Sequence, residues 1–451
     1  MAPASAPRRD SSPVHEAELR CIGILAVLCR VWRAKSSGKL RRQKAPNVSE
    51  AVEIVRLGHA GDGVTADGLF VRLTVPGDVV RIGRDGNRAV VEEIVSPGPE
   101  RTAPACRHFG RCGGCALQMM QHNAYLAWKR ELVIAALHQR GFSDPPAEAI
   151  RAIAAQTRRR AMVKGRKAGD QLLLGFYEAD SHRLVDIAEC PVLVPELTAL
   201  LAPLKQALGR ILHSGEQAEL HVTASDTGLD LSVKLARRRD PDLLMELSRL
   251  AAELNLARLC WNGEPIVVNT MPALRIGRVN IFLPPEAFLQ PSKKGEELLQ
   301  NLVSEAAGDA KRVADLFCGC GTFAFVLAER GQVTAIDSGA AQIAAVNVAA
   351  RESSVRVEGR TRDLFRRPLI AAELEPFDCV VLDPPRPGAA AQVRNLAQSH
   401  VPSVLYVSCS PSSFARDARI LCEGGYRLLR VVPVDQFLWS AHVELFAQFA
   451  R

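Results

Sequence analysis

The sequence has no apolar run long enough to cross a membrane and no evident export signal. The apolar run at residues 21–31 covers about 11 residues, whereas a membrane-spanning helix needs about 20. A basic segment follows this run, and no A-x-A-like cleavage site is present. We therefore expect a cytoplasmic protein that makes no membrane contact.

The chain also lacks the phosphate-binding loops of nucleotide enzymes. In ADLFCGCGTFAF (314–325), an apolar strand leads into Gly319 and Gly321 and then into a helical pattern. Such a turn brings main-chain N–H groups and a helix N-terminus close to a nucleotide-sized ligand. No Gly-Lys-Ser/Thr follows, and Phe323, Ala324 and Phe325 come after Thr322, so the third glycine of G-x-G-x-x-G is absent. These absences argue against triphosphates and dinucleotides and favour S-adenosylmethionine, whose adenosine carries no phosphate.

Length and charge narrow the class of protein further. A chain of 451 residues is long for one core, so several domains are expected. The net charge of +8 and the pI near 9.0 favour a polyanionic partner such as RNA. The chain is too large for a disulfide scaffold, so its 12 cysteines are expected to stay reduced in the cytosol.

The N-terminal part divides into a tail and a barrel. Residues 1–46 mix Pro, Ser, Ala and basic residues without periodicity, which predicts a disordered basic tail. Residues 47–100 hold short alternating segments separated by glycine-containing turns, which predict an OB-like β-barrel. Basic residues on the predicted strands or rims favour RNA contact over a β appendage without a ligand; they are Arg72, Arg81, Arg84 and Arg88.

Four cysteines form a spaced set in the next region. Cys106-x5-Cys112-Gly-Gly-Cys115 is local, and Cys190, followed by Pro191, lies far along the chain. Four thiolates can enclose an iron–sulfur cluster or a zinc ion. Zinc sites usually pair two C-x2-4-C knuckles, whereas the Gly-Gly pair and the final Cys-Pro favour a [4Fe–4S] cluster. Zinc and scattered core cysteines are the alternatives.

Residues 101–279 are predicted to form a central α+β domain. A helical pattern at 118–140 precedes alternating segments at 172–179 and 229–236 and a helix near 241–254. Few acidic residues are interleaved among the basic residues at 158–160 and 164–167. This charge pattern favours contact with RNA phosphates over a solvated face.

Residues 280–451 alternate between helix and strand, which predicts a doubly wound, Rossmann-like α/β sheet. Helices are predicted at 293–307, 322–330, 339–350, 389–398 and 412–422. Strands are predicted at 313–317, 332–336, 379–383, 403–408, 426–433 and 443–449. In such sheets ligands bind at the carboxyl ends of the strands.

Acidic residues stand at the ends of predicted strands or in the loops that follow. Asp337 ends the second strand, where an acid can accept hydrogen bonds from both ribose hydroxyls. Asp363 is placed to bind the adenine amino group. Asp383 begins Asp-Pro-Pro-Arg, where Arg386 occupies the place of the base-stacking aromatic residue found in exocyclic-amine methylases. Solvated strand-end or turn carboxylates are the alternative for Asp337 and Asp363.

Cys409 and Glu444 are the candidates for covalent catalysis at a pyrimidine. Cys409 follows a strand in YVSCS (406–410) and precedes a helix, a position expected to lower the thiol pKa. Pyrimidine C5 cannot attack a methyl sulfonium until a thiolate adds to carbon 6 and makes an enolate. Glu444 is the candidate base for the C5 proton. The alternative for Cys409 is a buried small hydrophobic residue.

Taken together, these segments resemble the RNA uridine-5-methyltransferase family. The resemblance rests on FLQ (288–290), DLFCGCGTF (315–323), DPPRPG (383–388), YVSCS (406–410) and HVE (442–444). It covers residues 48–451, and the TRAM-like barrel and four cysteines make it similar to the family's 23S ribosomal RNA branch. Ser292, Ser410 and Leu438 depart from the family's Asn, Asn and Pro, and Ser410 adjoins the expected base-binding site.

The resemblance implies a role for each candidate residue. It implies a [4Fe–4S] cluster on Cys106, Cys112, Cys115 and Cys190, and cofactor contacts from Gln290, Phe317, Thr322, Asp337, Asp363 and Asp383. Cys409 matches the nucleophile and Glu444 the proton acceptor. The predicted function is S-adenosylmethionine-dependent methylation of uridine C5 by a monomer, with ribosomal RNA favoured over transfer RNA. A transfer RNA enzyme and a non-catalytic RNA-binding iron–sulfur protein are the alternatives.

Overall fold

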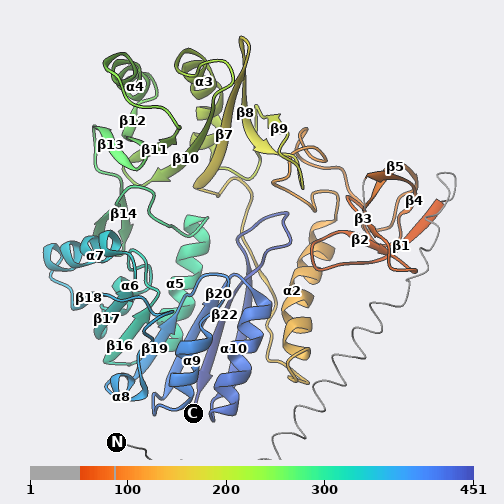
Figure 1. Ribbon diagram of the computed structural model, residues 1–451. Coiled ribbons are helices and arrows are strands. Elements are labelled where there is room, and N and C mark those ends of the chain that lie inside the picture. Colours follow the sequence, from red (N-terminus) through yellow and green to blue (C-terminus); the bar gives the residue numbers. More distant parts are fainter. Residues whose placement is uncertain (1–50, 86–87) are drawn as a thin grey trace, which may run out of the picture.

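The computed structural model describes residues 51–85 and 88–451 of the chain (Figure 1). The predicted tail at residues 1–46 lies outside the described residues. The described part contains a closed barrel, a seven-stranded sheet, a two-stranded sheet and an eight-stranded sheet. None of the described helices is long and apolar enough to cross a membrane.

The barrel stands at one side of the molecule, in orange in Figure 1. Its strands are β1 (Ala51–Leu57), β2 (Gly63–Thr65), β3 (Phe70–Val71), β4 (Val79–Asp85) and β5 (Arg88–Ser96). They pair in the order β1-β2-β3-β5-β4, so the predicted small barrel is confirmed. A small apolar core fills it, consisting of Ile54, Val71, Val80, Ile82 and Ala89. On the outer face Arg81 pairs with Glu93 at 2.8 Å.

The central domain is built on a seven-stranded sheet in the order β13-β12-β11-β10-β7-β8-β9. Its strands are β7 (Arg160–Ala168), β8 (Gln171–Tyr177), β9 (Leu184–Asp186), β10 (Gln217–Ser225), β11 (Gly228–Lys234), β12 (Leu256–Trp261) and β13 (Glu264–Val268). Helices α3 (Pro195–Ile211) and α4 (Pro241–Glu253) pack against the sheet and share its apolar core. The hairpin β14 (Ala273–Ile276) and β15 (Val279–Phe282) leads to the C-terminal sheet. The α+β prediction is confirmed.

The C-terminal sheet has eight strands in the order β18-β17-β16-β19-β20-β22-β21-β6. The strands are β16 (Arg312–Leu316), β17 (Gln332–Asp337), β18 (Val357–Thr361), β19 (Cys379–Leu382), β20 (Ser403–Ser408), β21 (Arg427–Asp435), β22 (Glu444–Ala450) and β6 (Arg151–Ala152). All neighbours pair in parallel except those of β22, which is antiparallel to β20 and β21. The chain order reverses between β16 and β19, where a doubly wound sheet opens a ligand crevice.

Helices cover both faces of this sheet. They are α2 (His122–His138), α5 (Lys293–Ala307), α6 (Ala324–Leu327), α7 (Ala340–Glu352), α8 (Ala371–Leu374), α9 (Ala390–Ala397) and α10 (Pro411–Glu423). Every strand and helix predicted after residue 280 is present, although α6 is shorter than expected. β18 was expected as a strand before Asp363 but was given no bounds, because it alternates weakly and carries charges. β6 and α8 were not predicted, because both are short.

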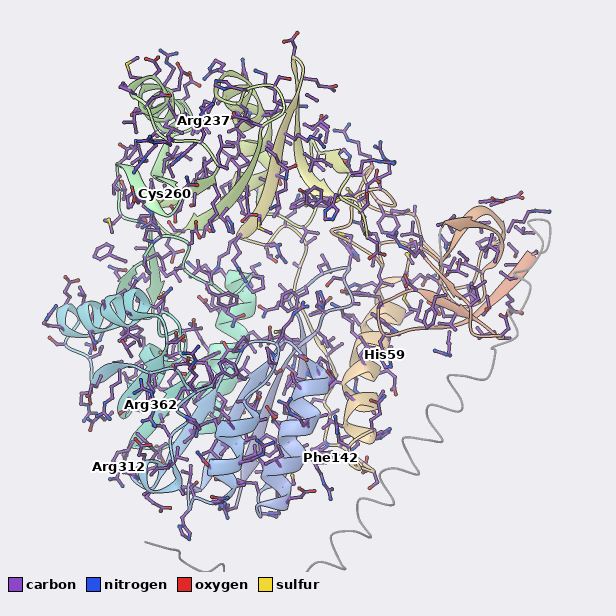
Figure 2. The ribbon with its side chains drawn as sticks, in the orientation of Figure 1. His59, Phe142, Arg237, Cys260, Arg312 and Arg362 are labelled. Carbon is purple, nitrogen blue, oxygen red and sulfur yellow. The ribbon has the colours of Figure 1, made fainter. Side chains whose placement is uncertain are left out.

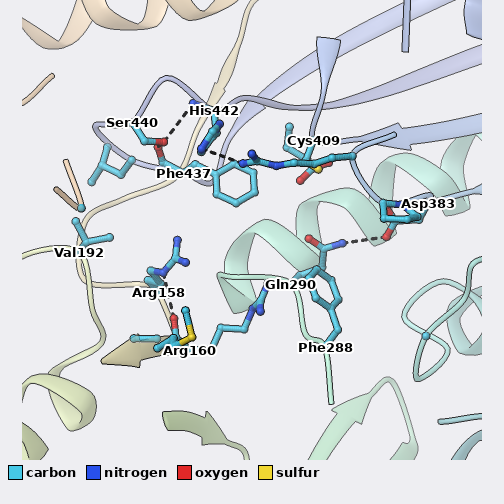
Figure 3. Close-up of a pocket in the computed structure, with 18 of the residues that line it drawn as sticks. Arg158, Arg160, Val192, Phe288, Gln290, Asp383, Cys409, Phe437, Ser440 and His442 are labelled. Carbon is cyan, nitrogen blue, oxygen red and sulfur yellow. Dashed lines mark hydrogen bonds between the residues drawn. The ribbon is translucent and has the colours of Figure 1, made fainter. Parts of the chain in front are cut away.

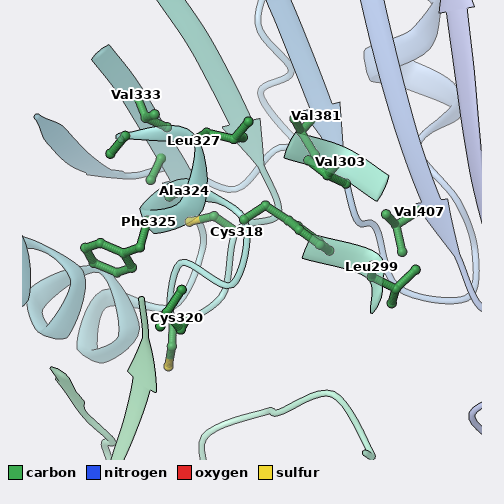
Figure 4. Close-up of a cluster of buried hydrophobic side chains, with 14 of the residues drawn as sticks. Leu299, Val303, Cys318, Cys320, Ala324, Phe325, Leu327, Val333, Val381 and Val407 are labelled. Atoms are coloured by element: carbon green, nitrogen blue, oxygen red, sulfur yellow. The ribbon is translucent and has the colours of Figure 1, made fainter. Parts of the chain in front are cut away.

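Adjacent residues of the central strands point to two different hydrophobic cores. Val313 of β16 faces the core formed with α5, in which Leu299 and Val303 pack near Val381 and Val407 (Figure 4). The neighbouring side chains Ala314 and Leu316 face the core formed with α2, α9 and α10. Phe142, just beyond α2, packs on this second core (Figure 2). A sheet buried on both faces explains the nearly continuous apolar runs of these strands.

A buried ion pair fastens α2 to the C-terminal end of β21. Asp435 is fully buried and binds Lys129, which is also fully buried. Tyr125 donates its hydroxyl hydrogen to Asp435 at 3.0 Å and accepts a hydrogen bond from the Trp439 main-chain N–H at 2.8 Å. Lys129 donates in addition to the carbonyl oxygen of Phe437 at 3.0 Å. The loop 436–443 therefore starts from a fixed point.

We predict that Lys129→Met lowers the free energy of unfolding by about 3–5 kcal/mol, because it leaves the Asp435 carboxylate buried without a cation. Arg419→Met serves as the control, since Arg419 forms an exposed pair with Glu423 at 2.9 Å. Loss of an exposed helical pair should cost no more than about 0.5 kcal/mol. Urea denaturation followed by circular dichroism measures both variants. Equal losses would contradict the anchoring role of Lys129.

Candidate active site

One cavity of about 930 Å³ lies at the carboxyl ends of the C-terminal strands and extends to the central domain. The cavity is lined by all the site residues that were predicted from the sequence: Cys106, Cys112, Cys115, Cys190, Gln290, Phe317, Thr322, Asp337, Asp363, Asp383, Cys409 and Glu444. They come from segments more than 300 residues apart in the chain, as Cys106 and Glu444 illustrate. The structure therefore brings the predicted site residues together in one space.

The glycine turn forms one wall of the cavity. Phe317, Gly319 and Gly321 have φ values of +63°, +54° and +83°, so the main chain turns sharply after β16. At Gly321 a Cβ atom would lie 2.7 Å from the Phe325 ring, so only glycine fits. Asp337 accepts hydrogen bonds from the N–H groups of Gly319 at 3.0 Å and Gly339 at 2.7 Å. This carboxylate therefore holds the turn, and it also lines the cavity.

Asp363 and a pair of aromatic rings lie beside this wall. The Asp363 carboxylate accepts hydrogen bonds from the N–H groups of Phe365 at 3.0 Å and Arg366 at 3.2 Å. The rings of Phe317 and Phe365 are 5.4 Å apart, and Phe365 is half exposed. Two rings at a cavity wall offer an apolar surface to a flat ligand. Phe365 was not singled out from the sequence, where RDLF reads as an ordinary turn after a strand.

A chain of side-chain hydrogen bonds joins the acids of the site. Gln290 donates its Nε2 hydrogen to Asp383 at 3.1 Å, as Figure 3 shows. Gln436 donates from Nε2 to Gln290 Oε1 at 2.9 Å and to Glu444 Oε2 at 2.7 Å. Two carboxamides therefore connect two carboxylates in the order Asp383, Gln290, Gln436, Glu444.

Both carboxyl groups hold their protons more tightly than usual. Burial, followed by the charge of Asp383, raises the pKa of Glu444 well above its ordinary value, against the hydrogen bond from Gln436. Burial raises the pKa of Asp383 to about 7, against the hydrogen bond from Gln290. A carboxylate with a raised pKa is a stronger base once it is ionised. The pair therefore suits proton transfer near neutral pH.

Cys409 is half-buried and lines the cavity near these acids. The prediction of a lowered pKa was wrong: burial, followed by the charges of Glu444 and Asp383, raises the pKa of this thiol to about 11. Arg386 acts in the opposite direction but does not outweigh them. Ser410 caps the N-terminus of α10 by accepting a hydrogen bond from the Ser413 N–H.

Arg386 and His442 lie on the rim of the cavity. The Arg386 guanidinium donates to His442 Nε2 at 2.9 Å (Figure 3). Burial, followed by the charge of Arg386, lowers the pKa of His442, so its ring is neutral. A neutral ring whose lone pair already accepts from Arg386 is a weaker candidate base than Glu444.

The three arginines that the sequence predicted to contact RNA phosphates differ in burial, because Arg159 is buried whereas Arg158 and Arg160 are partly exposed. Arg159 is buried and pairs with Glu296 of α5 at 2.6 Å, so it links two domains instead. Arg158 and Arg160 line the cavity, and the Arg160 guanidinium lies 4.2 Å from the centre of the Phe288 ring. Lys164 pairs with Glu219. Their spacing in the sequence could not show which of these side chains the strand turns inward.

The four spaced cysteines are free thiols, and all of them are partly buried. Burial raises the pKa of Cys115 to about 12, and the charges of Cys190, Cys112 and Cys106 add to this effect. In the chain outside residues 1–50 and 86–87, no three Cys, His, Asp or Glu residues are gathered tightly enough to mark a metal site. The donor set itself consists of sulfur alone, which fits an iron–sulfur cluster or zinc.

The cysteine segment is tied to the loop 436–443 by main-chain hydrogen bonds. The N–H groups of Ala116 and Leu117, directly after Cys115, donate to the Trp439 carbonyl oxygen at 2.8 and 3.1 Å. Gly113 packs on the segment after β8, where a Cβ atom would lie 2.8 Å from the Tyr177 carbonyl oxygen. The conformation of the cysteine segment is therefore coupled to the loop that precedes Glu444.

The order of the C-terminal sheet, its glycine turn and the position of the cavity define a Rossmann-like methyltransferase domain. The profile of the tRNA (uracil-5-)-methyltransferase family matches residues 274–449. An uncharacterized RNA methyltransferase of Brucella melitensis is 44% identical over 406 residues, 89% of this chain and 97% of that protein. The 23S rRNA (uracil(1939)-C(5))-methyltransferase RlmD of Halomonas elongata is 34% identical over 426 residues, 86% of each chain. This chain therefore belongs to the RNA uracil-5-methyltransferase family.

A solved structure has the same fold. The crystal structure of the Pyrococcus abyssi tRNA (uracil-54, C5)-methyltransferase, in complex with S-adenosyl-L-homocysteine, superposes with a TM-score of 0.70. The match covers 89% of this chain and 100% of that chain at 23% sequence identity. The predicted family and fold class are both confirmed, and the chain is an RNA methyltransferase.

The raised pKa of Cys409 predicts the pH dependence of its reactivity. Only the thiolate is alkylated, so the rate of reaction with iodoacetamide should be half-maximal near pH 11. An ordinary thiol would reach half of its maximal rate near its usual pKa of 9.0. Mass spectrometry of the peptide that contains Cys409 separates this thiol from the other cysteines. A midpoint at or below pH 9 would contradict the effect of the two buried acids.

Proposed function

We propose that this enzyme transfers a methyl group from S-adenosylmethionine to C5 of uridine in 23S ribosomal RNA through a covalent bond to Cys409. The observation that carries the proposal is that Cys409, Asp383 and Glu444 line the same cavity as the glycine turn. A thiol, a base and a cofactor-sized cavity are what C5 methylation needs. The relationship to the 23S rRNA enzyme of Halomonas elongata supports the choice of RNA.

S-adenosylmethionine supplies an electrophilic methyl group on a positively charged sulfur. Asp337 and Asp363 are proposed to receive the ribose hydroxyls and the adenine amino group, with Phe317 and Thr322 on the same wall. A carboxylate accepts such hydrogen bonds without rearrangement. Asp383, which stands beside Gln290, is proposed to face the cationic end of this ligand. A positive charge there would offset the carboxylates that raise the pKa of Cys409.

The proposed reaction begins when Cys409 releases its thiol proton to solvent and the thiolate sulfur adds to carbon 6 of uracil. The electron pair of the C5–C6 double bond then forms an enolate, and C5 takes the methyl group while the electron pair of the methyl–sulfur bond stays on the departing sulfur. Glu444 accepts the proton that C5 still carries, and the C6–S bond breaks to restore the double bond. The sulfur leaves as the thiolate, which takes back a proton from solvent, and Glu444 passes the C5 proton to solvent, so both residues return to their starting states.

The four cysteines are proposed to hold a [4Fe–4S] cluster. The support is that Cys106, Cys112, Cys115 and Cys190 line one end of the cavity and raise one another's pKa. Such a cluster would supply a cross-link between the segment 106–115 and Cys190, distant in sequence. Zinc remains the alternative for the same donor set.

The remaining parts are proposed to serve RNA binding. The barrel at residues 51–96 is proposed to be a TRAM domain, the part built on the seven-stranded sheet a central domain, and the eight-stranded sheet, together with α2 and β6, the catalytic domain. Arg158 and Arg160 at the cavity are proposed to contact RNA near the reacting nucleotide. Arg159, buried against Glu296, is excluded from this role.

We expect RNA that carries 5-fluorouridine to trap the enzyme covalently. Fluorine cannot leave C5 as a cation, so Glu444 has no proton to remove and the Cys409 adduct persists. Denaturing gels should show a protein–RNA band that depends on S-adenosylmethionine. Fragments of 23S ribosomal RNA should form it more readily than transfer RNA does, and the reverse preference would favour the transfer RNA alternative.

Two variants test the roles of the side chains in this assay. Cys409→Ala should abolish both adduct and turnover, since no sulfur can add to carbon 6. Glu444→Gln should accumulate a methylated adduct on ordinary uridine RNA, with turnover lowered about 10²- to 10⁴-fold. Wild-type turnover in Cys409→Ala would overturn the covalent mechanism. RNA binding without any methylation by the wild-type protein would instead support the non-catalytic alternative.

Protein purified without oxygen should contain about four irons and four sulfides per chain if the cysteines hold the proposed cluster. Cys190→Ser should lower both contents and the melting temperature, because this ligand joins distant segments. Cys260→Ser is a matched control, since Cys260 is buried in β12 away from the cavity. Stoichiometric zinc without sulfide would rule out the cluster.

A further inference from the structure

Gln436 follows β21 at the start of the loop 436–443 and was not singled out from the sequence. Its side chain is 5% exposed. Its Nε2 group donates both to Glu444 Oε2 at 2.7 Å and to Gln290 Oε1 at 2.9 Å. One amide therefore touches the proposed base and also the carboxamide that binds Asp383.

The partners of Gln436 fix which end of its amide faces Glu444. The Nε2 group of Gln290 is used by Asp383 at 3.1 Å, so Gln290 presents an oxygen to Gln436. With an acceptor on each side, Gln436 must point its N–H groups toward both. Its own Oε1 has no hydrogen-bond partner in the described part of the chain. A Cβ atom on Gly295 would lie 2.7 Å from this oxygen, so glycine leaves it just enough room.

The main chain around Gln436 is fixed as well. Asp435 on one side is held by Lys129 and Tyr125, and the Phe437 carbonyl on the other side accepts from Lys129 at 3.0 Å. Glu444 begins β22 directly across from Val434, two residues before Gln436. The pairing of β21 with β22 therefore brings the side chains of Gln436 and Glu444 within hydrogen-bond distance.

We propose that Gln436 is the positioning residue of the base, and this inference rests on the proposed function. It holds Glu444 by Oε2, while no described residue donates to the other oxygen, Oε1. Oε1 is then the atom that takes the C5 proton while the C6–S electron pair returns to Cys409. Because the N–H of Gln436 stands between Glu444 and Gln290, it also keeps Glu444 from rotating toward Asp383.

The role of Gln436 is confined to one step of the reaction. Addition of Cys409 and transfer of the methyl group do not require Glu444 to be oriented, whereas removal of the C5 proton does. A misplaced base slows proton transfer by about 10- to 100-fold. Loss of the Gln436 amide should therefore make the last step rate-limiting.

Gln436→Met keeps the length of the side chain and removes its N–H groups. We expect product release to fall by about 10- to 100-fold and a methylated covalent adduct to accumulate on ordinary uridine RNA. Deuterium at uridine C5 should slow this variant more than it slows the wild type. Gln436→Asn, which keeps an N–H group on a shorter chain, should show the same changes and covers the case in which Gln436→Met does not fold.

Gln392→Met is the matched control. Gln392 of α9 is buried and exchanges hydrogen bonds with the main chain of Leu369 at 2.8 and 3.0 Å, away from the cavity. It should lose stability but keep the wild-type isotope effect and form no excess adduct.

A wild-type isotope effect and no adduct in both Gln436 variants would overturn the inference, even if their turnover falls. Failure of the proposed function looks different, because then the wild type itself forms no Cys409 adduct with 5-fluorouridine RNA.

Discussion

The buried contact of Asp435 with Lys129 and Tyr125 determines the geometry of the reaction centre. It sits where β21 ends and the loop 436–443 begins, so it fixes the first residue of that loop against α2. Two such charges can stay in the interior only while both are paired. Because separating Asp435 from Lys129 would cost free energy, the start of the loop keeps one position. Gln436 and Glu444, which flank the loop, are therefore held in place as well.

Three buried acids near the cavity, Asp315, Asp383 and Glu444, form no ion pair with a described residue. Asp315 is fully buried, and burial, followed by the charge of Asp383, raises its pKa well above the usual value. Asp383 and Glu444 have raised pKa values nearby. Such an arrangement is unfavourable without a ligand and becomes favourable beside a positive charge. A cationic ligand at this end of the cavity would therefore lower the pKa values of these carboxyl groups.

Much of this arrangement could be predicted from the sequence. In a doubly wound sheet, ligands bind at the carboxyl ends of the strands. Asp337, Asp383 and Cys409 were therefore predicted from their positions at or just after the ends of predicted strands. The predictions that failed were those that depend on the direction of a side chain or on its surroundings in the folded protein. The thiol pKa was misjudged because Asp383 and Glu444 approach Cys409 only in three dimensions. Arg159 was taken for a surface charge because a run of basic residues does not show which side chain points into the protein. Gln436 was not predicted because glutamine is common in loops.

The hydrogen bonds from Ala116 and Leu117 to the Trp439 carbonyl oxygen join the cysteine segment to the loop 436–443. That segment carries the thiols of Cys106, Cys112 and Cys115, and thiols are open to oxidation. A change in the oxidation state of these thiols would therefore alter the loop that precedes Glu444, although the two segments lie more than 300 residues apart in the chain.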